Sequence, residues 1–300
     1  MRNIGDYYSI PHLPIMINEV ILALNIKPNG IYVDGTLGKG GHSKSIIKKL
    51  SGKGLLIGID RDEQSISFCN QYFKEEKTPH LFYHESYSNF NKILDKLKIK
   101  KVDGIFLDLG LSSVQLESAN RGFSYKVNSD LDMRFDLKQK RKAFDILNNF
   151  DFKNLSDIIF KYSNERRSRL IAKKIIDLRP MKSVNDLVEA IRRSTPPKNR
   201  VKTLARVFQA IRIEVNNEIN LLKEFLSSFT NKLNDNGRIA IISFHSIEDR
   251  LVKHNFKQMG LDGSLDIHTK KPIIPTRYEM SKNLRCKSAK LRVAEKRPDA

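Results

Sequence analysis

Short apolar runs rich in β-branched residues alternate with amphipathic stretches through the first 110 residues. The apolar runs predict buried strands at residues 31–36, 54–62, 81–87 and 102–110. The stretches between them, and residues 15–26 before them, repeat their apolar positions with the period of an α-helix. Strands that alternate with helices form right-handed βαβ units around a parallel sheet. The pattern therefore predicts an α/β fold.

The pattern changes in the middle of the chain, where residues 116–203 are charged and helical without a convincing buried strand. Residues 154–179 predict a helix that ends before Pro180, and residues 183–194 predict another with Ser183 as its N-cap. Residues 203–229 keep one apolar helical face, and residues 237–244 resume the strand pattern. We therefore expect a discontinuous α/β domain, residues 1–115 and 204–300, with an inserted helical domain, residues 116–203, that recognises the substrate.

Composition narrows the cellular setting. The N-terminal residues lack the apolar core of a signal peptide, and no apolar run is long enough to span a bilayer. The only two cysteines, Cys69 and Cys286, form neither a disulfide framework nor a metal-binding spacing. We expect a cytoplasmic protein with no membrane partner and no metal ion.

The charge indicates a polyanionic partner. The chain carries 54 Lys and Arg against 34 Asp and Glu, for a formal net charge of +20. Residues 193–206 contain basic residues and no acid, and residues 270–297 contain ten basic residues and two acidic ones. Such clusters favour a phosphate-binding surface, although a solvated face has the same composition. The predicted phosphate contacts are Arg193, Lys198, Arg200, Lys202, Arg285, Lys287 and Lys290.

A glycine-rich stretch, YVDGTLGKGGHS, follows the first predicted strand at residues 32–43. A Walker A loop is excluded because Lys39 precedes a glycine instead of Ser or Thr. The dinucleotide fingerprint is incomplete because Ser43 stands where its third glycine is required. The loop of the class I methyltransferases remains, in which glycines let the backbone approach S-adenosylmethionine. A tight turn without a ligand is the alternative.

Two acidic residues support a nucleoside cofactor. Asp60 ends the second predicted strand, where a carboxylate can accept hydrogen bonds from ribose hydroxyls, and capping of a helix is its alternative role. Asp108 ends a later parallel strand, and ligands of open α/β sheets bind at that edge. The loop and both carboxylates are expected to meet there.

At this point the chain resembles the bacterial small-subunit rRNA cytosine-N4 methyltransferases, the RsmH or MraW family. The resemblance runs nearly from end to end, and its most specific blocks are DLDMRFD at residues 130–136 and SFHSIEDR at residues 243–250. The tail departs from the usual family pattern at Leu284, Cys286 and Lys287. The resemblance implies a class I S-adenosylmethionine-dependent methyltransferase (Rossmann-like) fold with a helical insertion.

The resemblance also implies an activity and a cofactor site. The implied reaction is N4-methylation of a cytidine in 16S rRNA, at the decoding centre of the small ribosomal subunit. His42 has an alternative role as a helix-start residue bonded to the backbone. The residues implied to contact S-adenosylmethionine are Gly40, Gly41, His42, Asp60, Tyr87, Asp108 and Gln115.

Substrate contacts are predicted from the segments near the fourth strand and the insertion. They are Ser112, Ser113, Asp132, Arg134 and His245, whose structural alternatives are helix capping, an ion-pair network and hydrogen bonding. No residue is assigned as the proton acceptor, and no cysteine lies where a cytosine-C5 mechanism needs a nucleophile. A methyltransferase acting on another nucleic acid, or a non-catalytic RNA-binding ribosome-assembly factor, is the alternative function. Both a monomer and a homodimer are compatible with the sequence.

Overall fold

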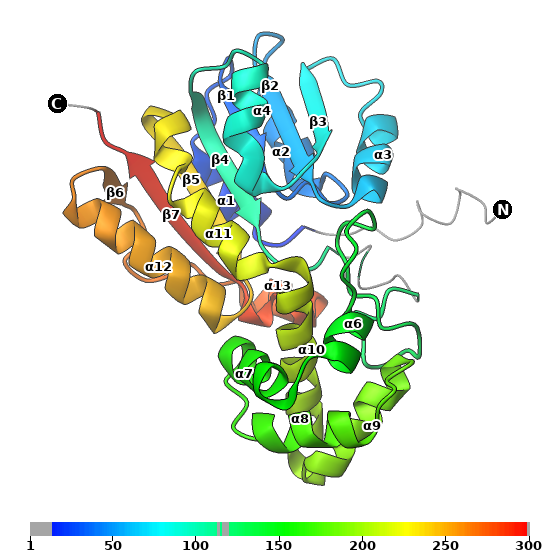
Figure 1. Ribbon diagram of the computed structural model, residues 1–300. Coiled ribbons are helices and arrows are strands. Elements are labelled where there is room, and N and C mark those ends of the chain that lie inside the picture. The colour runs from blue at the N-terminus through cyan, green and yellow to red at the C-terminus, as the bar shows by residue number, and fades with distance from the viewer. Residues whose placement is uncertain (1–13, 113–114, 116–119, 299–300) are drawn as a thin grey trace. The chain divides into compact units, whose positions relative to one another are not determined.

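The computed structural model describes residues 14–112, 115 and 120–298, which divide into two compact units (Figure 1). The first unit is Met1–Gly110 with Leu221–Ala300, and the second is Leu111–Asn220. The expected boundaries at residues 115/116 and 203/204 differ from these. The second boundary lies later because α10 (Arg200–Asn216) packs against α6, α7 and α9 of the second unit.

A seven-stranded sheet forms the centre of the first unit, in the order β3-β2-β1-β4-β5-β7-β6. The strands from β1 to β5 run parallel, whereas β7 is antiparallel to both β5 and β6. The connections run outward from β1 in both directions, so the topological switch point lies between β1 and β4. The strands are β1 (Ile31–Asp34), β2 (Leu55–Asp60), β3 (His80–His84), β4 (Val102–Asp108), β5 (Leu233–Ser243), β6 (Leu265–Ile267) and β7 (Lys290–Lys296).

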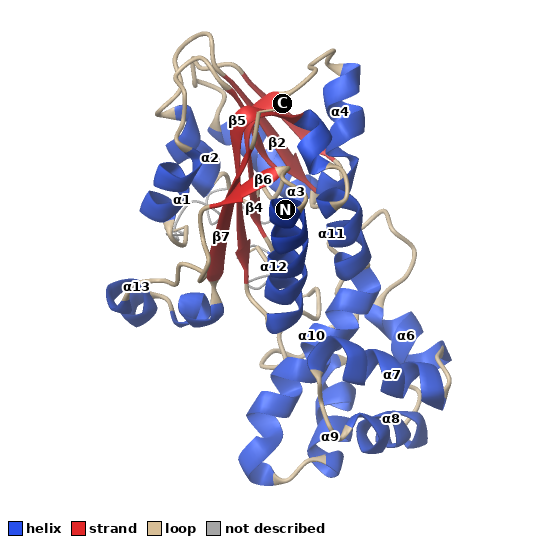
Figure 2. Cartoon of the chain, turned by 90° about the vertical axis from the view of Figure 1, so that its left-hand side faces the viewer, coloured by secondary structure: helices blue, strands red, loops and turns tan. Residues whose placement is uncertain are grey.

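Helices cover both faces of this sheet, as Figure 2 shows from the side. Successive strand residues face opposite ways, so Phe106 joins one apolar core while Ile105 and Leu107 join the other. The first core includes residues of α1 (Ile17–Leu24), α2 (Gly41–Ile47) and α3 (Glu63–Tyr72). The second includes residues of α4 (Phe90–Lys96), α11 (Glu218–Leu226) and α12 (Ser246–Leu261). The continuous apolar strands of the sequence are thus buried on both sides.

Helices make up most of the described part of the second unit. They are α6 (Ala143–Asn149), α7 (Phe152–Ser163), α8 (Ser168–Asp177), α9 (Val184–Ser194), η3 (Pro197–Asn199) and α10. Ser183 is the N-cap of α9, as predicted, and its N–H donates to Asp186 at 2.8 Å. In the part of the chain that the structure describes, no helix is long and apolar enough to cross a membrane.

Two long helices expected from the sequence are each broken in two. Residues 154–179 separate into α7 and α8, and residues 203–229 separate into α10 and α11. Asn164 and Asn217 take left-handed backbone conformations at the breaks, with φ of 54° and 53°. Asparagine tolerates this conformation and ends a helix there, although the apolar period continues past it.

The C-terminal part of the first unit completes the sheet and carries one short helix. The chain passes from β6 through α13 (Arg277–Lys282) and η5 (Leu284–Ser288) before β7 inserts between β5 and β6. Two further short 3₁₀ helices adjoin strands: η2 (Tyr87–Asn89) follows β3, and η4 (Phe229–Lys232) precedes β5. The antiparallel β7 adds to the parallel sheet that the first third of the sequence predicted.

Candidate functional site

The glycine loop connects β1 to α2 at the switch point of the sheet. Gly40 has a φ of 74°, and a Cβ atom there would lie 2.6 Å from the ring of Phe73. A Cβ atom on Gly41 would lie 2.4 Å from Cγ of Pro14. Both positions therefore exclude a side chain, the first by its backbone conformation and by packing and the second by packing alone.

Hydrogen bonds fix the loop to both neighbouring strands. The N–H of Gly38 donates to Oδ2 of Asp60 at the end of β2, at 2.7 Å. The N–H of Asp108 at the end of β4 donates to the hydroxyl of Thr36 in the loop, at 2.6 Å. The ends of three parallel strands therefore meet at one loop.

Asp34 holds the two ends of the loop together. Its Oδ1 accepts from the N–H of Thr36 at 3.1 Å, and its Oδ2 accepts from the hydroxyl of Ser43 at 2.7 Å. Asp34 is 1% exposed, so its contacts are shielded from water. These contacts fix the conformation of the glycine loop.

Three carboxyl groups at this edge of the sheet carry raised pKa values. Burial raises the pKa of Asp34 and that of Asp60 to about 6 each. Burial, followed by the negative charges of Asp34 and Glu248, raises the pKa of Asp108 to about 8. Because like charges and burial both disfavour the ionised forms, a cationic ligand at this edge would be stabilised.

One side-chain oxygen of Asp108 is left without a hydrogen-bond partner in the described part of the chain. Its side chain is 27% exposed, but its Oδ1 is buried and accepts no hydrogen bond from the described residues. A buried polar atom without a partner costs free energy unless a ligand satisfies it. This atom is therefore a candidate contact for a bound molecule.

His42 lies at the start of α2, where its Nε2 donates to the carbonyl oxygen of Ile15 at 2.8 Å. Burial lowers the pKa of His42 to about 4, so the ring is neutral and Nδ1 carries no proton. Nδ1 lies 4.0 Å from Oδ2 of Asp108. The bond to the backbone matches the structural alternative for His42, while its place beside Asp108 leaves the predicted ligand contact available.

Tyr87 also reaches the glycine loop. A Cβ atom on Gly35 would lie 3.0 Å from Cβ of Tyr87, so the residue after β3 packs against the loop. The ring of Tyr87 lies edge-on to Phe225, with 5.7 Å between centroids. Of the predicted cofactor residues, those at positions 40, 41, 42, 60, 87 and 108 belong to the first unit and surround one loop.

Gln115, the remaining predicted cofactor residue, belongs to the second unit. It is 3% exposed, and its Oε1 accepts from the N–H of Ser112 at 3.0 Å. The hydroxyl of Ser112 accepts from the N–H of Gln115 at 3.3 Å, the reciprocal pattern of a capping serine. Ser113 lies outside the described residues.

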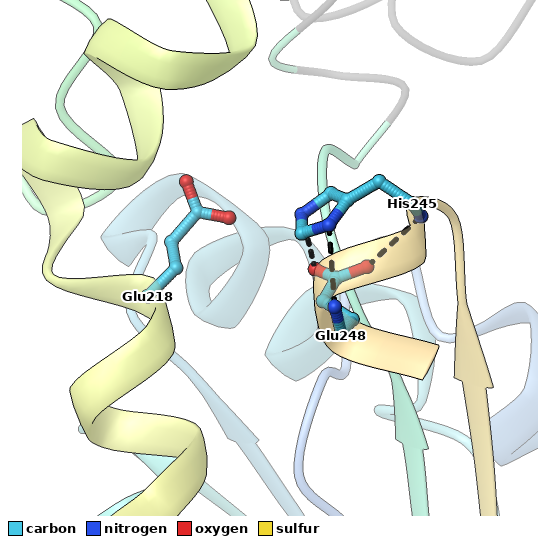
Figure 3. A group of neighbouring side chains, drawn as sticks. All are labelled: Glu218, His245 and Glu248. Atoms are coloured by element: carbon cyan, nitrogen blue, oxygen red, sulfur yellow. Dashed lines mark hydrogen bonds and ion pairs between the residues drawn. The ribbon is translucent and has the colours of Figure 1, made fainter. Parts of the chain in front are cut away.

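His245 is the N-cap of α12, as Figure 3 shows beside Glu248. Its Nδ1 accepts from the N–H of Glu248 at 3.3 Å, and its Nε2 lies 3.1 Å from Oε1 of the same residue. Glu248 Oε2 accepts in return from the N–H of His245 at 3.3 Å. This geometry agrees with the structural alternative for His245. Glu218, also drawn, belongs to the second unit and pairs with Arg212 at 2.8 Å.

Asp132 and Arg134 form a bidentate ion pair inside the second unit. Nε and Nη2 of Arg134 each lie 2.8 Å from an oxygen of Asp132, and Nη1 donates to the carbonyl oxygens of Leu137 and Gln139. The pair therefore fixes the loop that precedes α6. Its predicted substrate contact stays a prediction.

A basic surface lies on the helices of the second unit. Residues 161–206 contain fourteen basic residues and four acidic ones. A cavity of about 420 Å³ on this surface is lined by Arg167, Leu170, Lys173, Lys174, Asp177, Arg193 and Ser194. Of these residues, only Arg193 was predicted from the sequence, because the residues of α8 come together on one surface only when the helix is folded.

Sequence reasoning also missed Asp34, Thr36 and Ser43 as the residues that shape the loop. The position of Asp34 at the end of a buried strand was the available signal. The hydrogen bonds made by the hydroxyl groups of Thr36 and Ser43 depend on the conformation of the loop, which the spacing of residues in the sequence does not predict.

The strand order, with β7 reversed between β5 and β6, and the loop after β1 define a class I methyltransferase fold. The fold class predicted from the sequence is thereby confirmed. Residues 9–297 match the MraW methylase family, and the chain belongs to that family. It is a methyltransferase, and S-adenosylmethionine is its methyl donor.

The relatives of the chain are similar over nearly its whole length. It is 45% identical over 295 residues to ribosomal RNA small subunit methyltransferase H of Kosmotoga olearia, covering 96% of this chain and 98% of that protein. It is 41% identical over 306 residues to the protein of the same name from Clostridioides difficile, covering 95% and 98%. A solved rRNA methylase from Streptococcus thermophilus aligns with a TM-score of 0.46 and 11% identity, covering 97% of this chain and 100% of that one.

Proposed function

We propose that the protein methylates N4 of a cytidine in 16S rRNA, at the decoding centre of the small ribosomal subunit. The observation that carries the proposal is the near full-length similarity to relatives named ribosomal RNA small subunit methyltransferase H. The basic surface of residues 161–206 supports an RNA substrate, because clustered Lys and Arg bind phosphates. The proposed location is the cytoplasm, where ribosomes are assembled.

The residues at the loop fit S-adenosylmethionine. Its sulfonium and amino groups are cationic, and Asp34, Asp60 and Asp108 bring three carboxyl groups with raised pKa values to the same edge. Gly40, with a left-handed backbone, allows the tight turn of the loop, and Oδ1 of Asp108, which accepts no hydrogen bond from the described residues, offers an acceptor. When bound, S-adenosylmethionine supplies an electrophilic methyl group on sulfur.

The proposed roles of the site residues follow from their hydrogen bonds. Each oxygen of Asp60 accepts one backbone N–H, from Gly38 and from Asp62, and each has a further lone pair for a ribose hydroxyl. Asp108 and Tyr87 would contact the adenosine. Asp34 positions the loop through Thr36 and Ser43 and does not contact the methyl group, since its side chain is buried.

The N4 amine of cytosine is a weak nucleophile, and this determines what the protein must provide. Its lone pair is delocalised into the ring, so the enzyme must hold the nitrogen in line with the methyl carbon and accept a proton. Positioning of this kind contributes about 7–11 kcal/mol in favourable cases. The amine lies on the Watson–Crick edge, so the base must be unpaired or flipped out. We assign base capture to the second unit, with Ser112, Asp132 and Arg134 as the described candidates.

The cysteines favour methylation at nitrogen over methylation at C5. Methylation at C5 requires a thiolate that attacks the ring. Cys69 and Cys286 are both buried, and burial raises the pKa of each thiol. Neither is a candidate nucleophile.

The experiment is methyl transfer from radiolabelled S-adenosylmethionine with the purified protein. Small-subunit rRNA, large-subunit rRNA and intact small subunits serve as acceptors, and the labelled RNA is digested to nucleosides. Label in N4-methylcytidine from a small-subunit acceptor is the expected result. Label confined to large-subunit rRNA or to another nucleoside would overturn the proposal, and no transfer to any acceptor would favour a non-catalytic assembly factor.

A further inference from the structure

An exposed aromatic ring lies among cations on α13 and the loop before it. Tyr278 is 72% exposed, and Nζ of Lys282 lies 5.8 Å from the centroid of its ring. Residues 270–282 contain four basic residues, all exposed, and a single acidic one. The basic residues are Lys270, Lys271, Arg277 and Lys282.

The single acidic residue of this segment accepts hydrogen bonds from the protein through both side-chain oxygens. Oε1 of Glu279 accepts from the N–H of Met16 at 2.8 Å. Oε2 of Glu279 accepts from the N–H and the hydroxyl of Thr276, at 3.0 and 3.3 Å. Because both oxygens hold the fold, the outward side of α13 presents the ring and the cations.

The segment is fixed to the body of the first unit. The N–H of Ile273 donates to the carbonyl oxygen of Leu291 in β7 at 3.0 Å, and the N–H of Leu291 donates back at 2.9 Å. The capping box of Thr276 and Glu279 then starts α13. Tyr278 is therefore exposed on an anchored helix.

The hydrogen bond between Met16 and Glu279 also connects α13 to the glycine loop. Met16, which is bonded to Glu279, follows Ile15, whose carbonyl oxygen accepts from His42. Pro14 in the same short segment packs against Gly41. One three-residue segment thus contacts both α13 and the start of α2, so α13 belongs to the surroundings of the proposed cofactor site.

We propose that Arg277, Tyr278 and Lys282 bind single-stranded RNA, with the Tyr278 ring stacked on a base and the two cations paired with phosphates. An exposed ring flanked by cations is the arrangement by which proteins bind single strands, because every base has a π-face and every linkage a negative charge. A duplex hides the faces of its bases, which favours an unpaired strand. The identity of the RNA rests on the proposed function, whereas the contact itself does not.

The test compares variants of the full-length protein binding a labelled short oligocytidylate, measured by fluorescence anisotropy over a range of salt concentrations. Tyr278→Ala is expected to weaken binding about five- to a hundred-fold without changing the salt dependence. Tyr278→Phe keeps the ring and is expected to bind like the unsubstituted protein. Arg277→Gln and Lys282→Gln are expected to lower the slope of log K against log salt by about 0.7 each, the value for one phosphate of a single strand.

Leu261 provides the matched control, since it is 73% exposed at the end of α12 and carries no ring. Leu261→Ala is expected to leave RNA affinity unchanged. The inference is overturned if Tyr278→Ala binds as tightly as the unsubstituted protein, if Tyr278→Phe is as weak as Tyr278→Ala, or if the unsubstituted protein does not bind the oligonucleotide.

This experiment needs neither S-adenosylmethionine nor turnover, so it is independent of the methylated product. Weaker binding by Tyr278→Ala would support the contact even if no N4-methylcytidine formed. Conversely, correct product formation together with unchanged binding by Tyr278→Ala would leave the proposed function in place and remove the contact. Affinity for S-adenosylmethionine, measured on the same preparations, is expected to be unchanged in all the variants and verifies their folding.

Discussion

The N–H of Gly38 donates to the carboxylate of Asp60 at 2.7 Å, which joins the glycine loop to the end of β2 across 22 residues of sequence. The other oxygen of Asp60 accepts from the N–H of Asp62 at 2.8 Å. Asp60 therefore orders the loop and keeps further acceptor capacity for a ligand.

Asp60→Ala should weaken binding of S-adenosylmethionine by about 1.5–3 kcal/mol, because a charged hydrogen-bond acceptor is removed. Asp60→Asn keeps the shape of the side chain and one acceptor oxygen, so its effect should be smaller. Isothermal titration calorimetry measures both affinities, and thermal unfolding verifies that the variants are folded. An unchanged affinity in folded Asp60→Ala would remove Asp60 from the site.

The sequence predicted that the loop, Asp60 and Asp108 lie close together. Each is found at the carboxyl end of a buried strand, and parallel strands place these ends at one edge of the sheet. It could not decide between the roles offered for His245, since capping of α12 depends on how the chain turns after β5. It also missed the helix breaks at Asn164 and Asn217, where the apolar period continues through a left-handed residue. Local spacing thus predicted that the loop, Asp60 and Asp108 meet at one edge of the sheet, whereas the roles of the other residues depend on backbone turns.

Asp108 should make the free protein less stable as the pH rises. Its carboxyl group has an ordinary pKa of 3.8 and a folded pKa of about 8, so the folded state retains a proton that the unfolded state releases between these values. The stability it contributes is fully present below about pH 4 and is lost as the pH rises through 8. Asp108→Asn removes this dependence.

Urea unfolding at pH 5 and pH 8, without S-adenosylmethionine, measures the effect. Relative to the unsubstituted protein, Asp108→Asn should gain about 1–3 kcal/mol of unfolding free energy between the two pH values. Asp157→Asn, an exposed substitution on α7, serves as the control. An equal pH dependence for both variants would show that Asp108 is not the group responsible.

Gly40 and Gly52 should differ in their tolerance of alanine. A Cβ atom at Gly40 would meet Phe73 at 2.6 Å on a backbone with φ of 74°, whereas at Gly52 it would meet nothing within 4 Å. Gly40→Ala should cost about 1–2 kcal/mol from the left-handed backbone alone and should weaken S-adenosylmethionine binding. Gly52→Ala should change stability by less than about 0.5 kcal/mol. Thermal unfolding and calorimetry compare the pair, and equal effects would refute the packing argument.

The basic surface of the second unit should contribute to RNA affinity by its position and not by net charge alone. A triple variant, Arg193→Glu with Lys198→Glu and Lys202→Glu, should bind small-subunit rRNA more weakly. Its slope of log K against log salt should fall by about 0.7–0.9 for each phosphate that the variant no longer binds. Filter binding over a range of salt concentrations gives both quantities.

The matched control for that prediction reverses three exposed lysines on the first unit, Lys49, Lys74 and Lys77. Both triple variants lower the formal net charge of +20 by the same six charges. If both reduce affinity equally, the attraction is a long-range effect of net charge, and Arg193, Lys198 and Lys202 make no specific phosphate contacts.

The central claim is that this methyltransferase produces N4-methylcytidine in small-subunit rRNA. Nucleoside mass spectrometry of rRNA from cells with and without the gene tests it most directly, because N4- and C5-methylated cytidines are distinct products. N4-methylcytidine is expected in small-subunit rRNA; it should disappear when the gene is deleted and return with the intact gene. Loss of 5-methylcytidine instead, or an unchanged set of methylated cytidines, would contradict it.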